Sequence, residues 1–159
     1  MRIFAAAAAA TLALSTPAFA GDLAVYGGQF SIFDNSGQDG TEMFGLEYRV
    51  KDQFNGLRPT VGGFYTTNGG YFAYAGAYWD LPLNTAPFVI TPGFAAGYYS
   101  RGGGKELGYD LEFRSTFEVS YQFDNGQRLG AQISHLSNAS LGTDNPGVET
   151  IQAVYSHPF

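Results

Sequence analysis

The sequence predicts an all-β fold, an eight-stranded antiparallel transmembrane up-and-down β-barrel. Eight runs of about ten residues are typical of strands, and turn-forming residues separate them. Aromatic residues make up 16% of the chain and glycine is abundant, which fits aromatic girdles at membrane surfaces and close strand contacts. After the first twenty residues, no long pattern with a helical period appears.

The first twenty residues have the three parts of a secretory signal peptide. A basic start at Arg2 precedes an apolar stretch, which ends in the small-x-small pattern of residues 18–20. Pro17 interrupts this stretch, which is also short for a membrane span. We therefore expect residues 1–20 to be a signal peptide and residues 21–159 to form one outer-membrane barrel domain in a bacterial cell.

The charge and the cysteine count exclude several function classes. The chain carries a formal net charge of −6, which becomes −7 once Arg2 leaves with the signal peptide. A nucleic-acid-binding protein needs a basic surface, so nucleic acid is not an expected partner. Because the chain has no cysteine, it can form neither disulfides nor thiolate metal sites.

The first five strand runs are residues 23–33, 41–51, 57–66, 71–81 and 88–99. The first keeps Tyr26 and Phe30 in one register, and in the second Glu47 and Arg49 alternate with apolar residues. The third and fourth are rich in glycine and aromatic residues, so their sequence leaves open which face points inward. Pro92 removes a ladder donor from the fifth run, where we expect a bulge or a bend.

The sixth run, residues 111–124, alternates most clearly. One face is apolar and the other is polar for twice the usual strand length of a soluble protein. In a narrow barrel the charged face fills the lumen. We therefore expect lumenal ion pairs between the charges of this run and those of the second run, namely Glu112, Arg114, Glu118, Glu47 and Arg49.

The last two runs, residues 127–137 and 148–159, complete an even number of strands. The turns at residues 52–56 and 124–126 are short, whereas the connections around residues 35–40, 100–108 and 138–147 are longer. In small outer-membrane barrels the short turns face the periplasm and the longer loops face outside. The short connection at residues 68–70 departs from this pattern.

Residues 133–149 contain the candidate catalytic groups. His135 and Ser137 are two residues apart on a strand and therefore share a face. If the hairpin turns about Gly142, Glu149 lies opposite His135, with about 5 Å between their Cβ atoms. A hydroxyl, an imidazole and a carboxylate are the nucleophile, base and orienting group of a hydrolytic triad. Their register is the apolar one, which faces lipid on a barrel, so a lipid is the expected substrate.

The pattern His135-x-Ser137-Asn138, followed by Asn145-Pro146-Gly147-x-Glu149, resembles that of the PagL-type lipid A 3-O-deacylases. The chain also ends in Phe159, similar to the C-terminal signal of outer-membrane proteins. The resemblance implies hydrolysis of the ester-linked 3-hydroxyacyl chain at position 3 of lipid A. It assigns Ser137 as the nucleophile, His135 as the base and Glu149 as its orienting partner.

The resemblance also places Asn138 and Asn145 in the motif. We expect Asn138, through its backbone or side chain, to donate to the oxyanion, and residues 145–147 to shape the loop. No metal or other cofactor is required for this chemistry. Arg101 and Lys105, in an outer loop, are more simply explained as solvated charges than as ligands of lipid A phosphates.

Two alternatives remain open: a non-catalytic structural or adhesive barrel, and a lipid A acyltransferase with a phospholipid donor. The crowded ionic pattern of the sixth run leaves little interior room for the second. The expected partners are lipid A or lipopolysaccharide and the surrounding outer-membrane lipid. The sequence does not fix the oligomeric state, and a homodimer is one of the states we allow.

Overall fold

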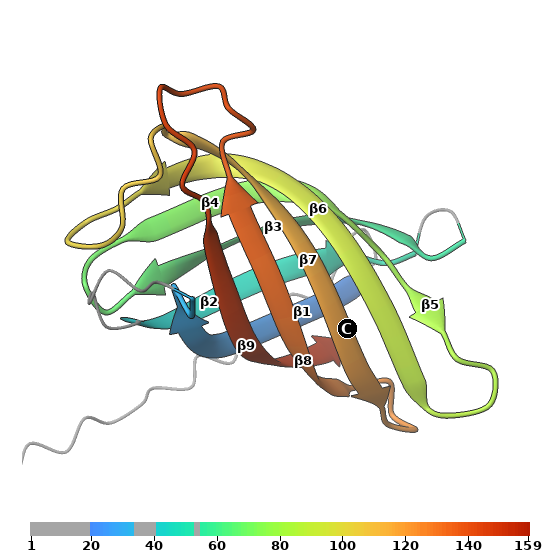
Figure 1. Cartoon of the computed structure of the whole chain (residues 1–159). Helices are drawn as coiled ribbons and strands as arrows, with labels where there is room; N and C mark the ends of the chain where they lie inside the picture. The colour runs from blue at the N-terminus through green and yellow to red at the C-terminus, as the bar shows by residue number, and fades with distance from the viewer. Residues whose placement is uncertain (1–19, 34–40, 53–54) are drawn as a thin grey trace, which may run out of the picture.

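The computed structural model describes residues 20–33, 41–52 and 55–159 (Figure 1). The predicted signal peptide, residues 1–20, lies outside the described residues except for Ala20. In the part of the chain that the structure describes, no helix is long and apolar enough to cross a membrane.

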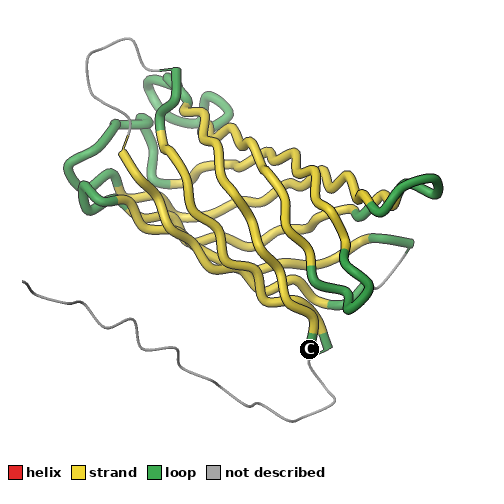
Figure 2. The backbone as a smooth tube through the Cα atoms, turned by 90° about the horizontal axis from the view of Figure 1, so that it is seen from below, coloured by secondary structure: helices red, strands yellow, loops and turns green. Residues whose placement is uncertain are grey.

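Nine strands form one sheet that closes on itself (Figures 1 and 2). They are β1 (Gly21–Phe30), β2 (Thr41–Val50), β3 (Leu57–Thr66), β4 (Tyr71–Trp79), β5 (Leu81–Pro82), β6 (Phe88–Ser100), β7 (Leu111–Gln122), β8 (Arg128–Ser137) and β9 (Val148–Pro158). The order is β4-β3-β2-β1-β9-β8-β7-β6-β5, and β4 also pairs with β6. Eight long strands therefore make a closed antiparallel wall, which confirms the predicted fold, and β5 is a two-residue extension beside β6.

The interruption between β4 and β5 lies opposite Pro92. The pairing of β4 with β6 ends at Tyr78 opposite Gly93, and β5 resumes the same register at Leu81 opposite Ile90. On the other side of β6, Pro92 pairs with Phe117 of β7 without an inserted residue. The pairings of β6 therefore contain no bulge at Pro92, and its missing N–H coincides with the gap in pairing between β4 and β5. A bend at this position stays a prediction.

The wall is apolar outside and polar inside, because side chains alternate along each strand. On β7, Phe117 and Val119 are 46% and 40% exposed, whereas Glu118 and Ser120 between them are buried. The outer surface therefore suits contact with lipid. The interior is filled partly by polar side chains and partly by a cluster of buried apolar ones, several of them aromatic, rather than by a channel of the porin type.

An ionic network fills the lumen. Arg49 donates to Glu47 Oε1 and to Glu118 Oε2, both over 2.6 Å, and Arg114 lies 3.9 Å from Glu47 Oε2. These pairs confirm part of the predicted network. The prediction was wrong for Glu112. This residue is buried, but neither of its carboxylate oxygens has a hydrogen-bond partner among the described residues.

The two ends of the barrel differ. The end that holds the start of β1 and the end of β9 also holds the connections after β2, β4 and β7, and we call it the turn end. The other end, the loop end, carries the connections after β1, β3, β6 and β8 (Figure 2). Ser137 ends β8 and Glu149 lies near the start of β9, so both belong to the loop end.

Candidate active site

His135 and Glu149 face each other across β8 and β9. They are direct cross-strand partners, which confirms the predicted register. His135 Nδ1 and Glu149 Oε1 are 3.1 Å apart, and the two side chains are 48% and 42% exposed on the outer wall. With a hydrogen on Nδ1 donated to the carboxylate, Nε2 is left as the proton acceptor. The pair therefore has the arrangement of a base held by a carboxylate.

Ser137 lies on the same outer face as His135, two residues further along β8. It pairs with Phe113 of β7 and is partly exposed. Among the described residues, its Oγ makes no hydrogen bond, either to His135 or to any other group. In hydrolases without substrate this contact is often long and tightens only in the complex. The strand thus places the hydroxyl beside the base but not yet in contact with it.

Gly147 closes the site from the loop side. Its φ of +60° lies in the left-handed region, where glycine carries no steric penalty. A Cβ added to it would lie 2.8 Å from His135 Cε1 and 3.4 Å from Nε2. The backbone of the loop therefore runs against the Nε2 edge of the imidazole. The sequence marked Gly147 as a loop residue, but its contact with the base is visible only in the structure.

Asn138 holds two loops together behind the nucleophile. Its backbone N–H donates to Asn145 Oδ1 over 3.0 Å, and its Nδ2 donates to the carbonyl oxygens of Leu107 and Asp144, both over 2.7 Å. All of its N–H groups are thus engaged, and its buried Oδ1 has no hydrogen-bond partner within the described part of the chain. In this structure Asn138 has no spare donor for an oxyanion, and Asn145 shapes the loop by accepting its backbone hydrogen bond.

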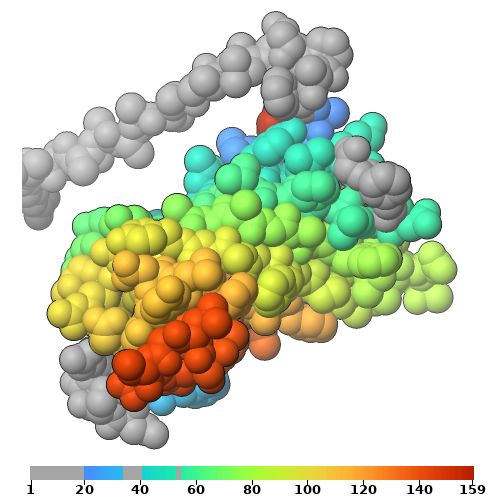
Figure 3. All heavy atoms as spheres, turned by 90° about the horizontal axis from the view of Figure 1, so that it is seen from above, coloured from blue at the N-terminus to red at the C-terminus, as the bar shows by residue number. Residues whose placement is uncertain are grey.

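A tight turn follows the nucleophile directly. Ala139 and Ser140 have φ values of 52° and 63°, and Leu141 N–H donates to Asn138 O over 3.0 Å. Two left-handed residues in this arrangement make a type I′ turn, which usually contains glycine, asparagine or aspartate. Because alanine and serine do not favour this conformation, the residue types at 139 and 140 do not predict the turn. Residues 138–147 pack against residues 101–110 beside them (orange-red and yellow in Figure 3).

An apolar groove of about 310 Å³ adjoins the pair of His135 and Glu149. It lies on the outer wall where β7, β8 and β9 meet the segment after β1. Its lining residues are Ile32, Phe33, Ser115, Thr116, Phe117, Ile133, Ser134, His135, Glu149 and Thr150. The site therefore combines a base, a hydroxyl and a surface that accepts hydrocarbon.

Solved structures with the same fold include two outer-membrane barrels. The crystal structure of the outer membrane enzyme PagL superposes with a TM-score of 0.66 at 21% identity, covering 87% of this chain and 99% of that one. Neisserial surface protein A superposes with a TM-score of 0.66 at 15% identity, covering 87% of this chain and 97% of the other. These similarities show an outer-membrane type of β-barrel fold.

Two curated proteins are similar in sequence. Lipid A deacylase PagL of Pseudomonas aeruginosa is 36% identical over 74 residues, which are 46% of this chain and 43% of that protein. Lipid A deacylase PagL of Bordetella bronchiseptica is 28% identical over 74 residues, 45% of this chain and 42% of that protein. The aligned part thus spans less than half the length of these relatives.

The family comparison covers more of the chain. Residues 28–158 match the family described as Lipid A 3-O-deacylase (PagL). This range contains the strand and loop that carry His135, Ser137 and Glu149, together with most of the barrel wall. The chain therefore belongs to the PagL family of lipid A 3-O-deacylases.

Proposed function

We propose that this chain is a lipid A 3-O-deacylase of the bacterial outer membrane. It hydrolyses the ester of the 3-hydroxyacyl chain at position 3, with Ser137 as nucleophile, His135 as base and Glu149 as orienting carboxylate. The observation that carries the proposal is the 3.1 Å contact between His135 Nδ1 and Glu149 Oε1 on the apolar outer wall. Ser137 follows on the same face.

The chemistry requires one proton acceptor and one nucleophile. As Ser137 Oγ attacks the acyl carbonyl, its proton passes to His135 Nε2, and Glu149 stabilises the imidazolium. The tetrahedral intermediate collapses, the sugar oxygen leaves with that proton, and the acyl group stays on Ser137. Water then gives a proton to His135 and attacks the acyl-enzyme. Ser137 Oγ recovers the proton, and a free 3-hydroxy fatty acid is released.

The placement of the site supports a lipid substrate. Exposing polar groups to lipid on the outer wall costs the least free energy near the membrane surface. His135, Ser137 and Glu149 lie at the loop end of the barrel. We infer that this end faces outside, where lipid A forms the outer leaflet. The apolar groove beside His135 and Glu149 accepts the acyl chain, while the ester stays at the boundary of headgroups and tails.

The alternatives fit the structure less well. An acyltransferase with an interior acyl pocket needs an open lumen, whereas Arg49, Glu47, Glu118 and Arg114 fill this one. A non-catalytic barrel would not need a histidine paired with a carboxylate on its lipid-facing wall, where such groups are costly. All three proposed catalytic groups come from one chain, so the chemistry needs no second copy, and a homodimer stays a prediction.

Mass spectrometry of lipid A tests the proposal. Lipid A from cells that express the wild-type chain should lose the mass of one 3-hydroxyacyl group, relative to cells without it. Cells that express Ser137→Ala should keep that group. Ser120→Ala is the matched control, because Ser120 Oγ is buried in the lumen and makes no hydrogen bond to any residue that the structure describes, so its removal should leave activity intact. Gain of an acyl chain would instead identify an acyltransferase.

A further inference from the structure

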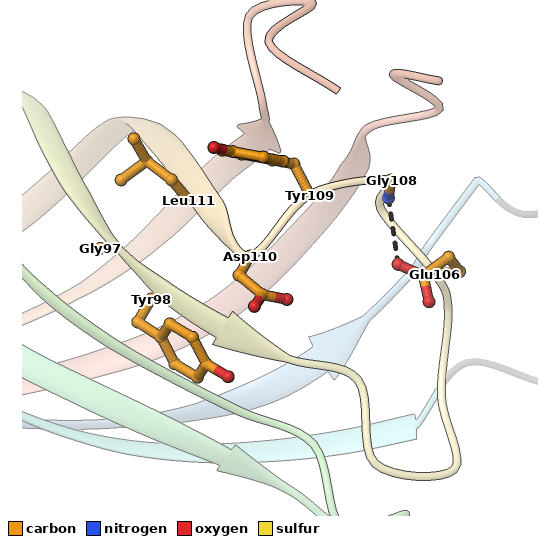
Figure 4. Close-up of a pocket in the computed structure, with 7 residues that line it drawn as sticks. All are labelled: Gly97, Tyr98, Glu106, Gly108, Tyr109, Asp110 and Leu111. Carbon is orange, nitrogen blue, oxygen red and sulfur yellow. Dashed lines mark hydrogen bonds between the residues drawn. The ribbon is translucent and has the colours of Figure 1, made fainter. Parts of the chain in front are cut away.

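A second hollow, of about 480 Å³, opens on the outer wall at the loop end (Figure 4). It lies between the ends of β6 and β7 and the segment 101–110 that joins them. The side chains that give it its chemistry are Tyr98, Tyr109 and Asp110, with Leu111 beside them. Neither the apolar groove nor the proposed triad includes any of these residues.

The register places this hollow one row of side chains from the nucleophile. Tyr98 pairs with Leu111, and Phe113 pairs with Ser137. Leu111 and Phe113 share the outer face of β7, about 7 Å apart at Cα. The hollow thus lies toward the loop end of Ser137. The apolar groove, which includes Ser115 of β7, lies on the other side. Ser137 therefore stands between a polar, aromatic hollow and a hydrocarbon surface.

The hollow has the chemistry of a site for a neutral, hydroxyl-rich ring. Tyr98 and Tyr109 are 50% and 48% exposed, so their apolar ring surfaces are open to a ligand. Figure 4 shows the carboxylate of Asp110 on the side of the segment that faces Tyr98. Asp110 makes no side-chain hydrogen bond among the described residues, and a carboxylate accepts hydrogen bonds from hydroxyl groups.

The charges disfavour a phosphate in this hollow. Glu106 already accepts a hydrogen bond from Gly108 N–H over 3.1 Å and lies 3.4 Å from Arg101. Arg101 and Glu106 therefore offset each other's charge, and the other charged residue that lines the hollow is Asp110, which is negative. A phosphate would be repelled by this carboxylate, whereas a sugar hydroxyl would donate to it.

The hollow is joined to the nucleophile by fixed contacts. Tyr99 N–H donates to Asp110 O over 2.8 Å, which anchors the aspartate to the end of β6. Leu107 O accepts from Asn138 Nδ2, and Asn138 follows Ser137 directly. A ligand held in the hollow would thus keep a defined position relative to Ser137, as a substrate-positioning site requires.

We propose that this hollow binds the glucosamine ring of the lipid A molecule whose ester reaches Ser137. The inference rests on the proposed function, and it adds a sugar-binding surface to that site. The ring packs on Tyr109 and Tyr98, and Asp110 accepts a hydrogen bond from a ring hydroxyl. The phosphates lie outside the hollow, and the acyl chain runs the other way into the apolar groove.

Kinetics with two esters test the inference. The substrates are purified lipid A in detergent micelles and a p-nitrophenyl ester of a fatty acid, which has no sugar. The variants are Tyr109→Ala and Asp110→Asn, and Tyr121→Ala is the matched control because Tyr121 is an exposed tyrosine at the turn end of β7, far along the wall from the hollow. For each, the readout is the ratio of kcat/KM for lipid A to kcat/KM for the simple ester.

We expect the ratio to fall about tenfold in Tyr109→Ala and in Asp110→Asn, and to stay at the wild-type value in Tyr121→Ala. A ratio that stays constant in both hollow variants overturns the inference, whether their absolute rates fall or not. The isosteric Asp110→Asn keeps the test valid if Tyr109→Ala does not fold. If the wild type hydrolyses the simple ester but not lipid A, the proposed function fails, and the inference fails with it.

Discussion

Gly147 lies against the imidazole of His135, so close that a single added methyl group would reach within 2.8 Å of Cε1. This contact joins the loop after β8 to the proposed base. It lies on the edge of the ring that carries Nε2, the atom that accepts the proton of Ser137 in the proposed mechanism. The position of the loop backbone therefore sets how much room the hydroxyl and the base have.

Gly147→Ala should reduce activity strongly. The new Cβ would displace the imidazole from its present position, and alanine at a φ of +60° is strained. We expect kcat/KM for lipid A to fall by about tenfold or more and the free energy of unfolding to fall by about 1 to 2 kcal/mol. Gly69→Ala is the control, because Gly69 has a φ of +91° but an added Cβ would make only an ordinary van der Waals contact, with Tyr65 Oη at 3.9 Å. The stability of Gly69→Ala should fall, but its activity on lipid A should stay at the wild-type value. Equal activity of both variants would contradict the steric role of Gly147.

Glu149→Gln should impair catalysis without destabilising the fold. Glutamine keeps the shape but loses the charge that stabilises the imidazolium, so kcat should fall by about 10² to 10⁴. Since the His135–Glu149 pair is about half exposed, its contribution to the free energy of unfolding is small. Initial rates and a thermal melt measure the two effects separately. Glu42→Gln, which changes an exposed carboxylate on β2, should behave as wild type in both assays.

Asn138→Ala should reduce stability as well as activity. The change leaves the carbonyl oxygens of Leu107 and Asp144 without their donor, which costs about 1 to 3 kcal/mol. Activity should fall because the loop that holds Gly147 loses its attachment. Denaturant unfolding in detergent measures the loss of stability, and kcat for lipid A measures the loss of activity. A variant with normal stability and a kcat lowered about a hundredfold would instead favour the oxyanion role predicted from the sequence.

The turn end offers a test by pH. Asp80 accepts hydrogen bonds from Arg128 over 2.7 Å, Thr91 over 2.9 Å and Arg58 over 3.3 Å. Burial would raise the pKa of Asp80, but the attraction of Arg128 and Arg58 outweighs it and holds the pKa below its ordinary value of 3.8. The stabilisation by this carboxylate is therefore complete above pH 3.8 and is lost as the pH falls through the lower folded-state pKa.

Asp80→Asn should consequently lower the free energy of unfolding at neutral pH. The difference between the variant and the wild type should shrink in acid, below pH 3.8. Unfolding curves recorded over a pH series measure this difference. If the difference in free energy of unfolding between the two proteins stays constant with pH, the ion pairs of Asp80 do not stabilise the barrel.

Period-two patterns explain what the sequence could predict. They placed His135, Ser137 and Glu149 on one outer face, because side chains alternate strictly on a strand and a hairpin fixes its cross-strand pairs. The same patterns identified Glu47, Arg49 and Glu118 as lumenal. These features depend only on strand direction and register, which are local properties of the chain.

Features that depend on how the barrel closes were not predictable. Glu112 lies on the buried, lumenal face of β7, as its position in the alternating pattern predicts, but it lacks the partner that was expected from β2. Its partners across the lumen depend on the relative shift of distant strands, which no local pattern encodes. The hydrogen bond from Asn138 Nδ2 to Leu107 O likewise joins residues that are 31 positions apart, so no local pattern identifies this partner of the amide.

The proposed function depends on the attack of Ser137 on the 3-hydroxyacyl ester of lipid A. The most direct measurement is the release of free 3-hydroxy fatty acid from purified lipid A by purified, folded protein, with wild type and Ser137→Ala compared over the same time course. We predict release by the wild type in step with loss of one acyl chain from lipid A, and none by Ser137→Ala. Equal release by the two proteins would contradict the role of Ser137 as the nucleophile. No release by the wild type would contradict the proposed deacylase activity.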